Sequence, residues 1–104
     1  MLDKETVREV AEKFAEEVKK ILNPNAILIF GSHVDGNPHE YSDIDIAIIC
    51  NAFEGNWYET MVELCGLSRE IRFDIEPHLL DEKHDRSGFV EHVMKTGEII
   101  YRAA

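Results

Sequence analysis

Two aspartates and a Gly-Ser pair are the residues of this sequence best suited to chemistry. Gly31 and Ser32 follow one short apolar run, and Asp43 and Asp45 precede the next, with ten residues between Ser32 and Asp43. Residues i and i+2 of a strand point to the same side, so the two carboxylates are expected to project together. Carboxylates this close repel each other unless a cation lies between them, and Mg²⁺, which prefers oxygen ligands, is the expected cation.

The Gly-Ser pair adds groups that suit a phosphate. Gly31 lets the backbone come close to a phosphate, and Ser32 offers a hydroxyl together with the backbone N–H groups around it. Mg²⁺ is usually bound by one or two carboxylates together with substrate phosphates. The segment therefore predicts a site for a metal-bound triphosphate.

A third carboxylate is needed if a second metal, about 3.5–4 Å from the first, is to activate an attacking hydroxyl. A third strand, expected over residues 71–80, supplies two candidates. Its period of two places Arg72, Asp74 and Glu76 on one face. An acid within an otherwise apolar strand is costly to bury without a partner. Asp74 or Glu76 is therefore expected to face the same cleft as the aspartate pair.

The elements that must position these residues alternate along the chain. Asp3 is expected to cap a first helix, and Ser87 a last helix that ends at Gly97. Between them, apolar spacing predicts strands at 26–30, covered on both faces, at 43–50 and at 71–80, a helix around 57–65, and a final edge strand or tail at 98–101. This alternation predicts an α/β (α+β) fold, a small mixed sheet with flanking helices.

Length and composition indicate one soluble domain. The chain has 104 residues, of which 44% are apolar and 31% charged, and no apolar run is long enough to span a membrane. The N-terminus has no basic segment followed by an apolar one, so no secretory signal is expected and the cytoplasm is the expected location. Cys50 and Cys65 have no C-x-x-C spacing and are expected to be buried thiols.

The formal net charge is −10, and the acids dominate the middle of the chain. No Lys or Arg occurs between Ile21 and Ser68. Because Lys and Arg supply most of the affinity for nucleic-acid phosphates, unaided binding of DNA or RNA is not expected.

The aromatic and histidine side chains have simpler expected roles. The five histidines lack zinc-type spacing and are expected on the surface or in packing. The aromatic residues are expected to build the core, although Trp57 or Tyr58 could instead form a partner surface. The core candidates are Phe14, Phe30, Phe53, Trp57, Tyr58, Phe73 and Phe89.

These motifs resemble the nucleotidyltransferase superfamily that has the fold of the DNA polymerase β palm, in particular its minimal single-domain members. The family pattern is Gly-Ser, ten residues, then Asp-x-Asp. Here Gly31-Ser32 is followed after ten residues by Asp43-Ile44-Asp45, within the Ser-Asp-Ile-Asp sequence typical of the family. The resemblance covers roughly residues 26–80.

The resemblance implies that residues 1–104 form one minimal nucleotidyltransferase domain. Such a domain transfers a nucleoside monophosphate from an NTP to a hydroxyl acceptor, with AMP as the default because ATP is abundant. Asp43 and Asp45 would bind Mg²⁺, with two ions in the active complex and a third acid assisting deprotonation of the acceptor. The order Arg72-Phe73-Asp74 favours Asp74 as that acid, with Glu76 as the alternative. The implied nucleotide-binding residues are Gly31, Ser32 and Ser42.

Two departures from the family pattern point to a missing half of the site. Many relatives have basic residues directly after the Gly-Ser, whereas this chain has His33, Val34 and Asp35. The missing positive charge would have to come from the fold, and the candidates are Arg69, Arg72, Lys83 and Arg86.

The second departure is size, because larger family members use an additional domain to hold the nucleotide base and the acceptor. Minimal members commonly act beside a helical partner of the HEPN type, in pairs several of which behave as toxin and antitoxin. The resemblance therefore implies a HEPN-type partner. The alternative is a catalytically weak or inactive module that acts by binding a partner protein, and self-association into a homo-oligomer is left open.

Overall fold

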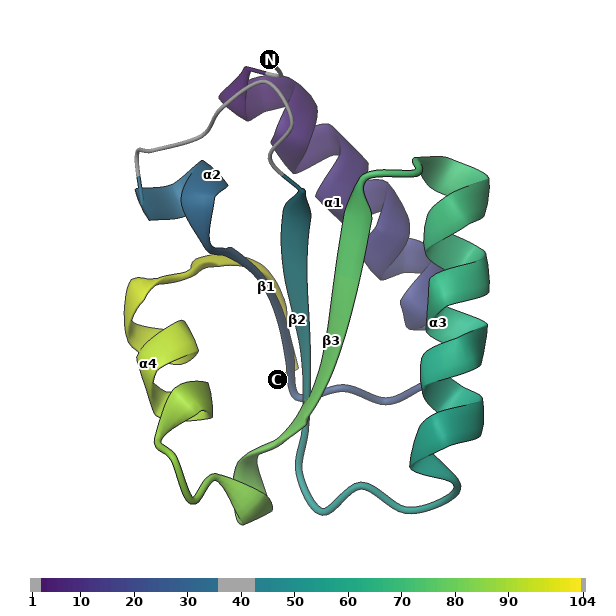
Figure 1. The fold of residues 1–104 in the computed structure, drawn as a ribbon, viewed down its shortest axis with the longest axis vertical. Helices are drawn as coiled ribbons and strands as arrows, with labels where there is room; N and C mark the ends of the chain where they lie inside the picture. The colour runs from purple at the N-terminus through teal and green to yellow at the C-terminus, as the bar shows by residue number, and fades with distance from the viewer. Residues whose placement is uncertain (1–2, 36–42, 104) are drawn as a thin grey trace.

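A computed structural model describes residues 3–35 and 43–103 as a mixed α/β fold, as predicted (Figure 1). Its elements in chain order are α1 (Lys4–Val18), β1 (Ala26–Phe30), α2 (Ser32–Asp35), β2 (Ile44–Cys50), α3 (Trp57–Ile71), β3 (Ile75–Asp81), the 3-10 turn η1 (Glu82–His84), α4 (Phe89–Thr96) and β4 (Glu98–Arg102). Within the described ranges, no helix has the length and apolar character needed to cross a bilayer.

The four strands form one mixed sheet in the order β3-β2-β1-β4. β1 pairs antiparallel with β2 and with β4, whereas β2 and β3 are parallel. A parallel pair needs a crossover connection, and α3 provides it. The last segment of the chain is therefore an edge strand, which was one of the two expected outcomes.

Helices α1 and α3 cover one face of the sheet (Figure 1). Alternate residues of each strand point into this core, as the period of two requires. The side chains buried there include Phe14 and Val18 of α1, Ile27 and Ile29 of β1, Ile44, Ile46 and Ile48 of β2, Leu64 of α3, and Ile75 and Leu79 of β3.

Helix α4 covers part of the opposite face. Val90 and Val93 of α4 pack with alternate strand residues, among them Leu28 of β1 and Ile49 of β2. The strand at 26–30 is thus covered on both faces, as predicted. The face beneath α4 is also the one that carries the candidate acids.

The helix ends match the predicted caps in part. Asp3 caps α1, with Oδ1 accepting a 2.7 Å bond from the N–H of Thr6, and Gly97 ends α4 as expected. Ser87 Oγ accepts a 3.3 Å bond from the N–H of Phe89, the first residue of α4, but the N-cap position is Gly88 and not Ser87 as predicted. The carboxylate of Asp85 accepts bonds from the N–H groups of Val90 and Glu91 at 2.9 and 3.1 Å, because a carboxylate has two oxygens to offer.

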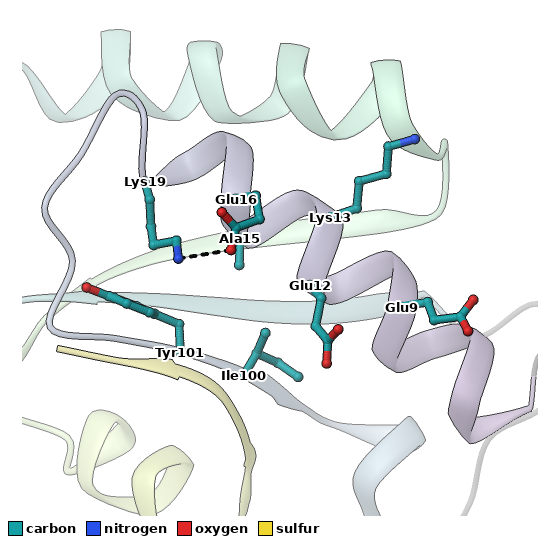
Figure 2. Close-up of a pocket in the computed structure, with 8 residues that line it drawn as sticks. All are labelled: Glu9, Glu12, Lys13, Ala15, Glu16, Lys19, Ile100 and Tyr101. Carbon is teal, nitrogen blue, oxygen red and sulfur yellow. Dashed lines mark ion pairs between the residues drawn. The ribbon is translucent and has the colours of Figure 1, made fainter.

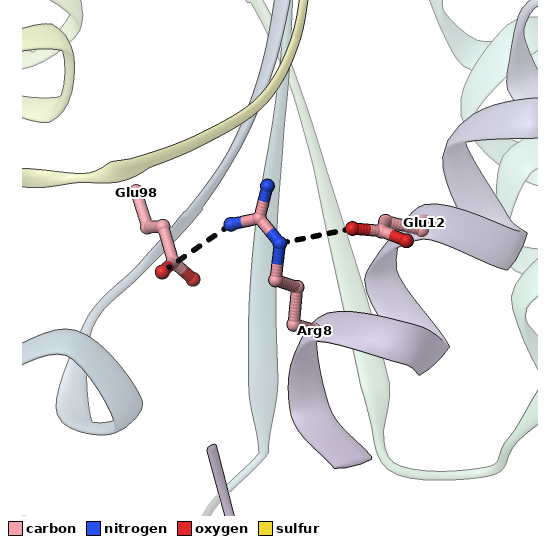
Figure 3. A network of polar contacts seen from close by, with 3 residues as sticks. All are labelled: Arg8, Glu12 and Glu98. Atoms are coloured by element: carbon pink, nitrogen blue, oxygen red, sulfur yellow. Dashed lines mark hydrogen bonds and ion pairs between the residues drawn. The ribbon is translucent and has the colours of Figure 1, made fainter. Parts of the chain in front are cut away.

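An ion-pair network ties α1 to the edge strand β4 (Figure 3). The Arg8 guanidinium lies 2.9 Å from a Glu12 oxygen and 3.4 Å from a Glu98 oxygen. All three side chains are about half exposed, so each pair adds at most about 1 kcal/mol to stability.

Two groups of sequence predictions need correction. The third strand begins at Ile75 and not at residue 71, because α3 continues to Ile71, whose side chain packs against the core. Phe14 is fully buried, but the expectation that the other aromatics build the core is wrong for Trp57, Tyr58, Phe73 and Phe89, which are 41%, 76%, 86% and 39% exposed. Both cysteines are free thiols, with Cys50 buried and Cys65 half-buried.

Candidate active site

The second aspartate of the motif lies directly beside an acid of the third strand. In the parallel pairing of β2 with β3, Asp45 is the register partner of Glu76. The residues on either side of Asp45 are buried beneath α1 and α3, so the Asp45 side chain points to the opposite face. Neighbouring strands lie about 4.7–4.9 Å apart, which brings the two carboxylates together.

His78 completes this acidic cluster. Its Nε2 atom lies 3.1 Å from Asp45 Oδ1 and 3.9 Å from Glu76 Oε1. Ligand atoms of the three side chains all lie within 4.8 Å of one another, close enough to surround one cation. Sequence reasoning missed His78, although it stands two residues after Glu76 and the strand period places the two on one face.

Gly31 packs tightly against Asp45. Phe30 is the register partner of Asp45, and Gly31 follows with a φ of +80°. A Cβ atom on Gly31 would overlap Asp45 Oδ2 and lie 3.3 Å from its Cγ. The glycine of the Gly-Ser pair is therefore required by the backbone conformation and by the nearness of the carboxylate.

The electrostatics of the cluster favour a cation. Burial and, after it, the charge of Asp45 raise the pKa of Glu76 above its ordinary value, and the charge of Asp43 adds to the effect. His78 acts in the opposite direction without cancelling it. Carboxylates that converge in this way repel one another and fit a divalent cation, whose charge would relieve the repulsion.

Asp74 lies outside this cluster. It sits in the turn before β3, where Arg72 Nε and Nη2 donate to its two carboxylate oxygens at 2.7 and 3.2 Å. Its backbone carbonyl accepts a 2.8 Å bond from the N–H of Ile44. The expectation that Arg72, Asp74 and Glu76 share one strand face is wrong, because β3 begins only at Ile75. Of the two candidate third acids, the fold brings Glu76 to Asp45.

The other predicted site residues lie around the start of β2. Asp43 is exposed directly before the strand, and the action of its charge on Glu76 indicates that it lies near the cluster. Ser32 is the first residue of the short helix α2, where the Gly31 carbonyl accepts a 3.0 Å bond from Val34. Ser42 lies outside the described residues.

None of the four basic candidates forms an ion pair with Asp45 or Glu76 in the described residues. Lys83 and Arg86 lie beyond the far end of β3, and the strand alone separates Glu76 from Asp81 by roughly 16 Å. Arg72 is engaged by Asp74, and α3 carries Arg69 on the sheet face opposite the cluster. Among the described residues, these four do not bring the missing positive charge to the site.

A groove lies at the other edge of the sheet (Figure 2). This groove of about 440 Å³ between α1 and β4 is lined by three glutamates, among them Glu16, and by Lys13 and Lys19. Lys19 lies 3.0 Å from Glu16 and 4.5 Å from the centre of the Tyr101 ring. Since β4 and β3 are opposite edges, this groove is separate from the acidic cluster.

Comparison with known families agrees with the motif. A sequence model described as "Polymerase beta, Nucleotidyltransferase" matches residues 12–104, most of the chain. The chain belongs to this family of nucleotidyltransferases. The predicted family, fold and enzyme class are thereby confirmed.

Solved structures share the fold. A candidate nucleotidyltransferase from Sulfolobus solfataricus is 28% identical with a TM-score of 0.67, and the match covers 93% of this chain and 81% of the other. A chain of a toxin–antitoxin complex with AMP-PNP is 23% identical with a TM-score of 0.64, covering 88% and 73%. A chain from the complex of a tri-AMPylated Shewanella oneidensis HEPN toxin with an MNT antitoxin is 20% identical with a TM-score of 0.59. The match covers 92% of this chain and 73% of the other. Among curated proteins, none matches this sequence.

Proposed function

We propose that this nucleotidyltransferase moves a nucleoside monophosphate, by default AMP, from an NTP to a hydroxyl on a HEPN-type partner protein, as the antitoxin of a toxin–antitoxin pair. The observation that carries the chemistry is the pairing of Asp45 with Glu76 beside Gly31. Two adjacent carboxylates at this point of the motif support a site for a metal-bound triphosphate.

In the reaction, the acceptor hydroxyl oxygen forms a bond to the α-phosphorus of the NTP. The bond from that phosphorus to the bridging oxygen breaks, and pyrophosphate leaves. The acceptor proton passes to a carboxylate, and Glu76 is the acid that we assign to receive it, because it lies beside Asp45 and its side chain is the more exposed of the two. Gly31 leaves room for the Asp45 carboxylate close to the backbone.

Asp43, Asp45 and Glu76 are the residues that would hold Mg²⁺, with two ions in the active complex. Bound Mg²⁺ would neutralise triphosphate charge and lower the pKa of the attacking hydroxyl. Asp74, engaged by Arg72, then has the separate role of fixing the turn that leads into β3.

Two observations support a partner protein. Structural relatives include chains from complexes of toxins with antitoxins, one with a tri-AMPylated HEPN toxin. In addition, the ion pairs of Asp45 and Glu76 among the described residues are with His78 and not with a Lys or Arg, although a triphosphate needs positive charge. A partner that contributes Lys or Arg would complete the site.

The test incubates the chain with a HEPN-type protein encoded beside it, Mg²⁺ and each labelled NTP, and measures the mass of the partner. We expect one or more added nucleotides with wild type. Asp45→Asn and Glu76→Gln should lower the rate at least about 100-fold, since each removes a carboxylate from the reacting centre. Asp74→Asn is the matched control and should keep most of the activity.

A large loss of activity in Asp74→Asn, with most of the activity kept in Glu76→Gln, would reassign the third acid to Asp74. Identical masses with wild type and Asp45→Asn, together with no binding of Mg²⁺-NTP by calorimetry, would contradict the enzyme.

The second candidate function is a module that binds a partner without catalysis. It is favoured by the exposed apolar side chains of Tyr58 and Val62 on α3, which stand beside exposed Glu59 and Glu63. An apolar patch with an acidic rim fits a partner that has basic residues around an apolar groove. Equal binding of the partner by wild type and Asp45→Asn, with no transfer by either, would support this function.

A further inference from the structure

The imidazole of His78 is held in place from the side of α4. The Phe30 ring meets it edge-on, with ring centres 4.9 Å apart and planes at 69°. Phe30 in turn meets Phe89 of α4, with centres 5.6 Å apart and planes at 79°. Edge-to-face contacts of this kind favour one ring orientation. The ring is therefore packed so that Nε2 faces the acids and not solvent.

The carboxylate of Asp45 is confined by His78 at one oxygen and by Gly31 at the other. Its Oδ1 atom lies 3.1 Å from His78 Nε2, and its Oδ2 atom lies against Gly31. The Asp45 side chain is 21% exposed and that of His78 30% exposed, whereas that of Glu76 is 54% exposed. Asp45 is thus the acid whose orientation the fold controls, and His78 is the side chain that bonds to it.

We propose that His78 is a positioning residue, which donates its Nε2–H to Asp45 Oδ1 and so fixes the carboxylate in the orientation that binds a divalent cation. The inference rests on the metal site of the proposed function. A nitrogen that donates this proton has no lone pair left for a metal, so His78 acts through Asp45 and not as a ligand. Loss of a hydrogen bond to a metal-binding group typically costs 10–100-fold in metal affinity.

The experiment measures Mn²⁺ binding from the electron paramagnetic resonance signal of the free ion, with no nucleotide or partner present. His78→Leu should weaken binding about 10–100-fold. His78→Gln should retain most of the affinity, because its amide nitrogen can take the place of Nε2 as the donor. His92→Leu, the same change at an exposed position of α4, is the matched control and should bind as wild type does. Circular dichroism checks that each variant is folded.

A second measurement does not depend on the metal. Long-range ¹⁵N–¹H correlation spectra of the metal-free protein report which ring nitrogen carries the proton, and we expect the Nε2–H form of His78. The Nδ1–H form would overturn the proposal whatever the metal does.

The remaining outcomes separate this inference from the proposed function. Unchanged Mn²⁺ affinity in His78→Leu would overturn the role of His78 and leave the metal site standing. An imidazole nitrogen bound directly to Mn²⁺, seen by pulsed electron paramagnetic resonance, would do the same. No Mn²⁺ binding by wild type would overturn the metal site, and the inference would fall with it.

Discussion

At the residue scale, Gly31 shows how one position serves both the backbone and the site. Its φ of +80° is a conformation that residues with a Cβ rarely adopt, and its Cα lies next to the Asp45 carboxylate. The glycine of the motif is therefore needed by the fold itself, whether or not a phosphate is bound. Ser32, one residue later, is under no comparable constraint, since it begins α2 with helical neighbours.

Gly31→Ala should lower the free energy of unfolding by about 1–2 kcal/mol, the cost of a left-handed conformation for alanine. It should also weaken Mn²⁺ binding, because the new methyl group displaces Asp45 Oδ2. Urea denaturation and a metal titration check the two effects. Gly66→Ala is the control, since a Cβ there has open space within α3 and should raise stability by about 0.5–1 kcal/mol. A Gly31→Ala protein with wild-type stability and Mn²⁺ affinity would contradict the close approach.

At the element scale, Asp81 holds the connection between β2 and α3 to the end of β3. Its carboxylate accepts bonds from the N–H groups of Ala52, Phe53 and Lys83 at 3.0, 2.9 and 2.9 Å. Ala52 has a φ of 58°, which these bonds help to maintain. The start of the crossover between the two parallel strands is thus held by one side chain, that of the last residue of β3.

The charge of Asp81 should make stability depend on pH. The bond from Lys83 first, and those from Phe53 and Ala52 after it, hold the pKa of Asp81 below its ordinary value of 3.8. A lowered pKa in the folded state stabilises the fold above the unfolded pKa, and this contribution is lost as the pH falls through the folded pKa. Asp81→Asn should therefore be less stable than wild type at pH 7, and the difference should shrink below about pH 4.

Urea midpoints of wild type and Asp81→Asn across this pH range measure the effect. Because other acids titrate in both proteins, only the difference between them reports on Asp81. A difference that stays constant from pH 7 to pH 3 would show that the charge of Asp81 contributes nothing.

At the scale of the whole molecule, the core under α1 and α3 carries the stability, and the acidic half of the site lies on the opposite face. Phe14 is completely buried in that core, whereas Phe73 is 86% exposed in the turn before β3. Phe14→Ala should cost about 3–5 kcal/mol, since it leaves a large cavity. Phe73→Ala should change stability by less than about 0.5 kcal/mol. Thermal or urea unfolding of the two variants compares the same substitution at a buried and an exposed site, and equal losses would contradict the described core.

The sequence by itself determined the main elements and the acid motif, because both depend on local spacing. Apolar runs bounded by turn residues indicate the positions of β1 and β2, and helical spacing indicates α1 and α4. The separation of Gly31-Ser32 from Asp43 and Asp45 is enough to indicate the family, since it lies within one short stretch of the chain. The absence of Lys and Arg between Ile21 and Ser68 also predicts, from the sequence alone, that positive charge for a triphosphate would have to come from outside this stretch.

Only the tertiary structure decided which third-strand residues meet Asp45. The period of two offers Asp74 and Glu76 equally, because both have the same parity along the chain. Helix α3 extends to Ile71 and Arg72 bonds to Asp74 in the turn that follows, so β3 begins only at Ile75. The parallel register of β2 with β3 then places Glu76 opposite Asp45, and His78 lies next to both. Register is a property of two strands packed together, and no single segment of sequence contains it.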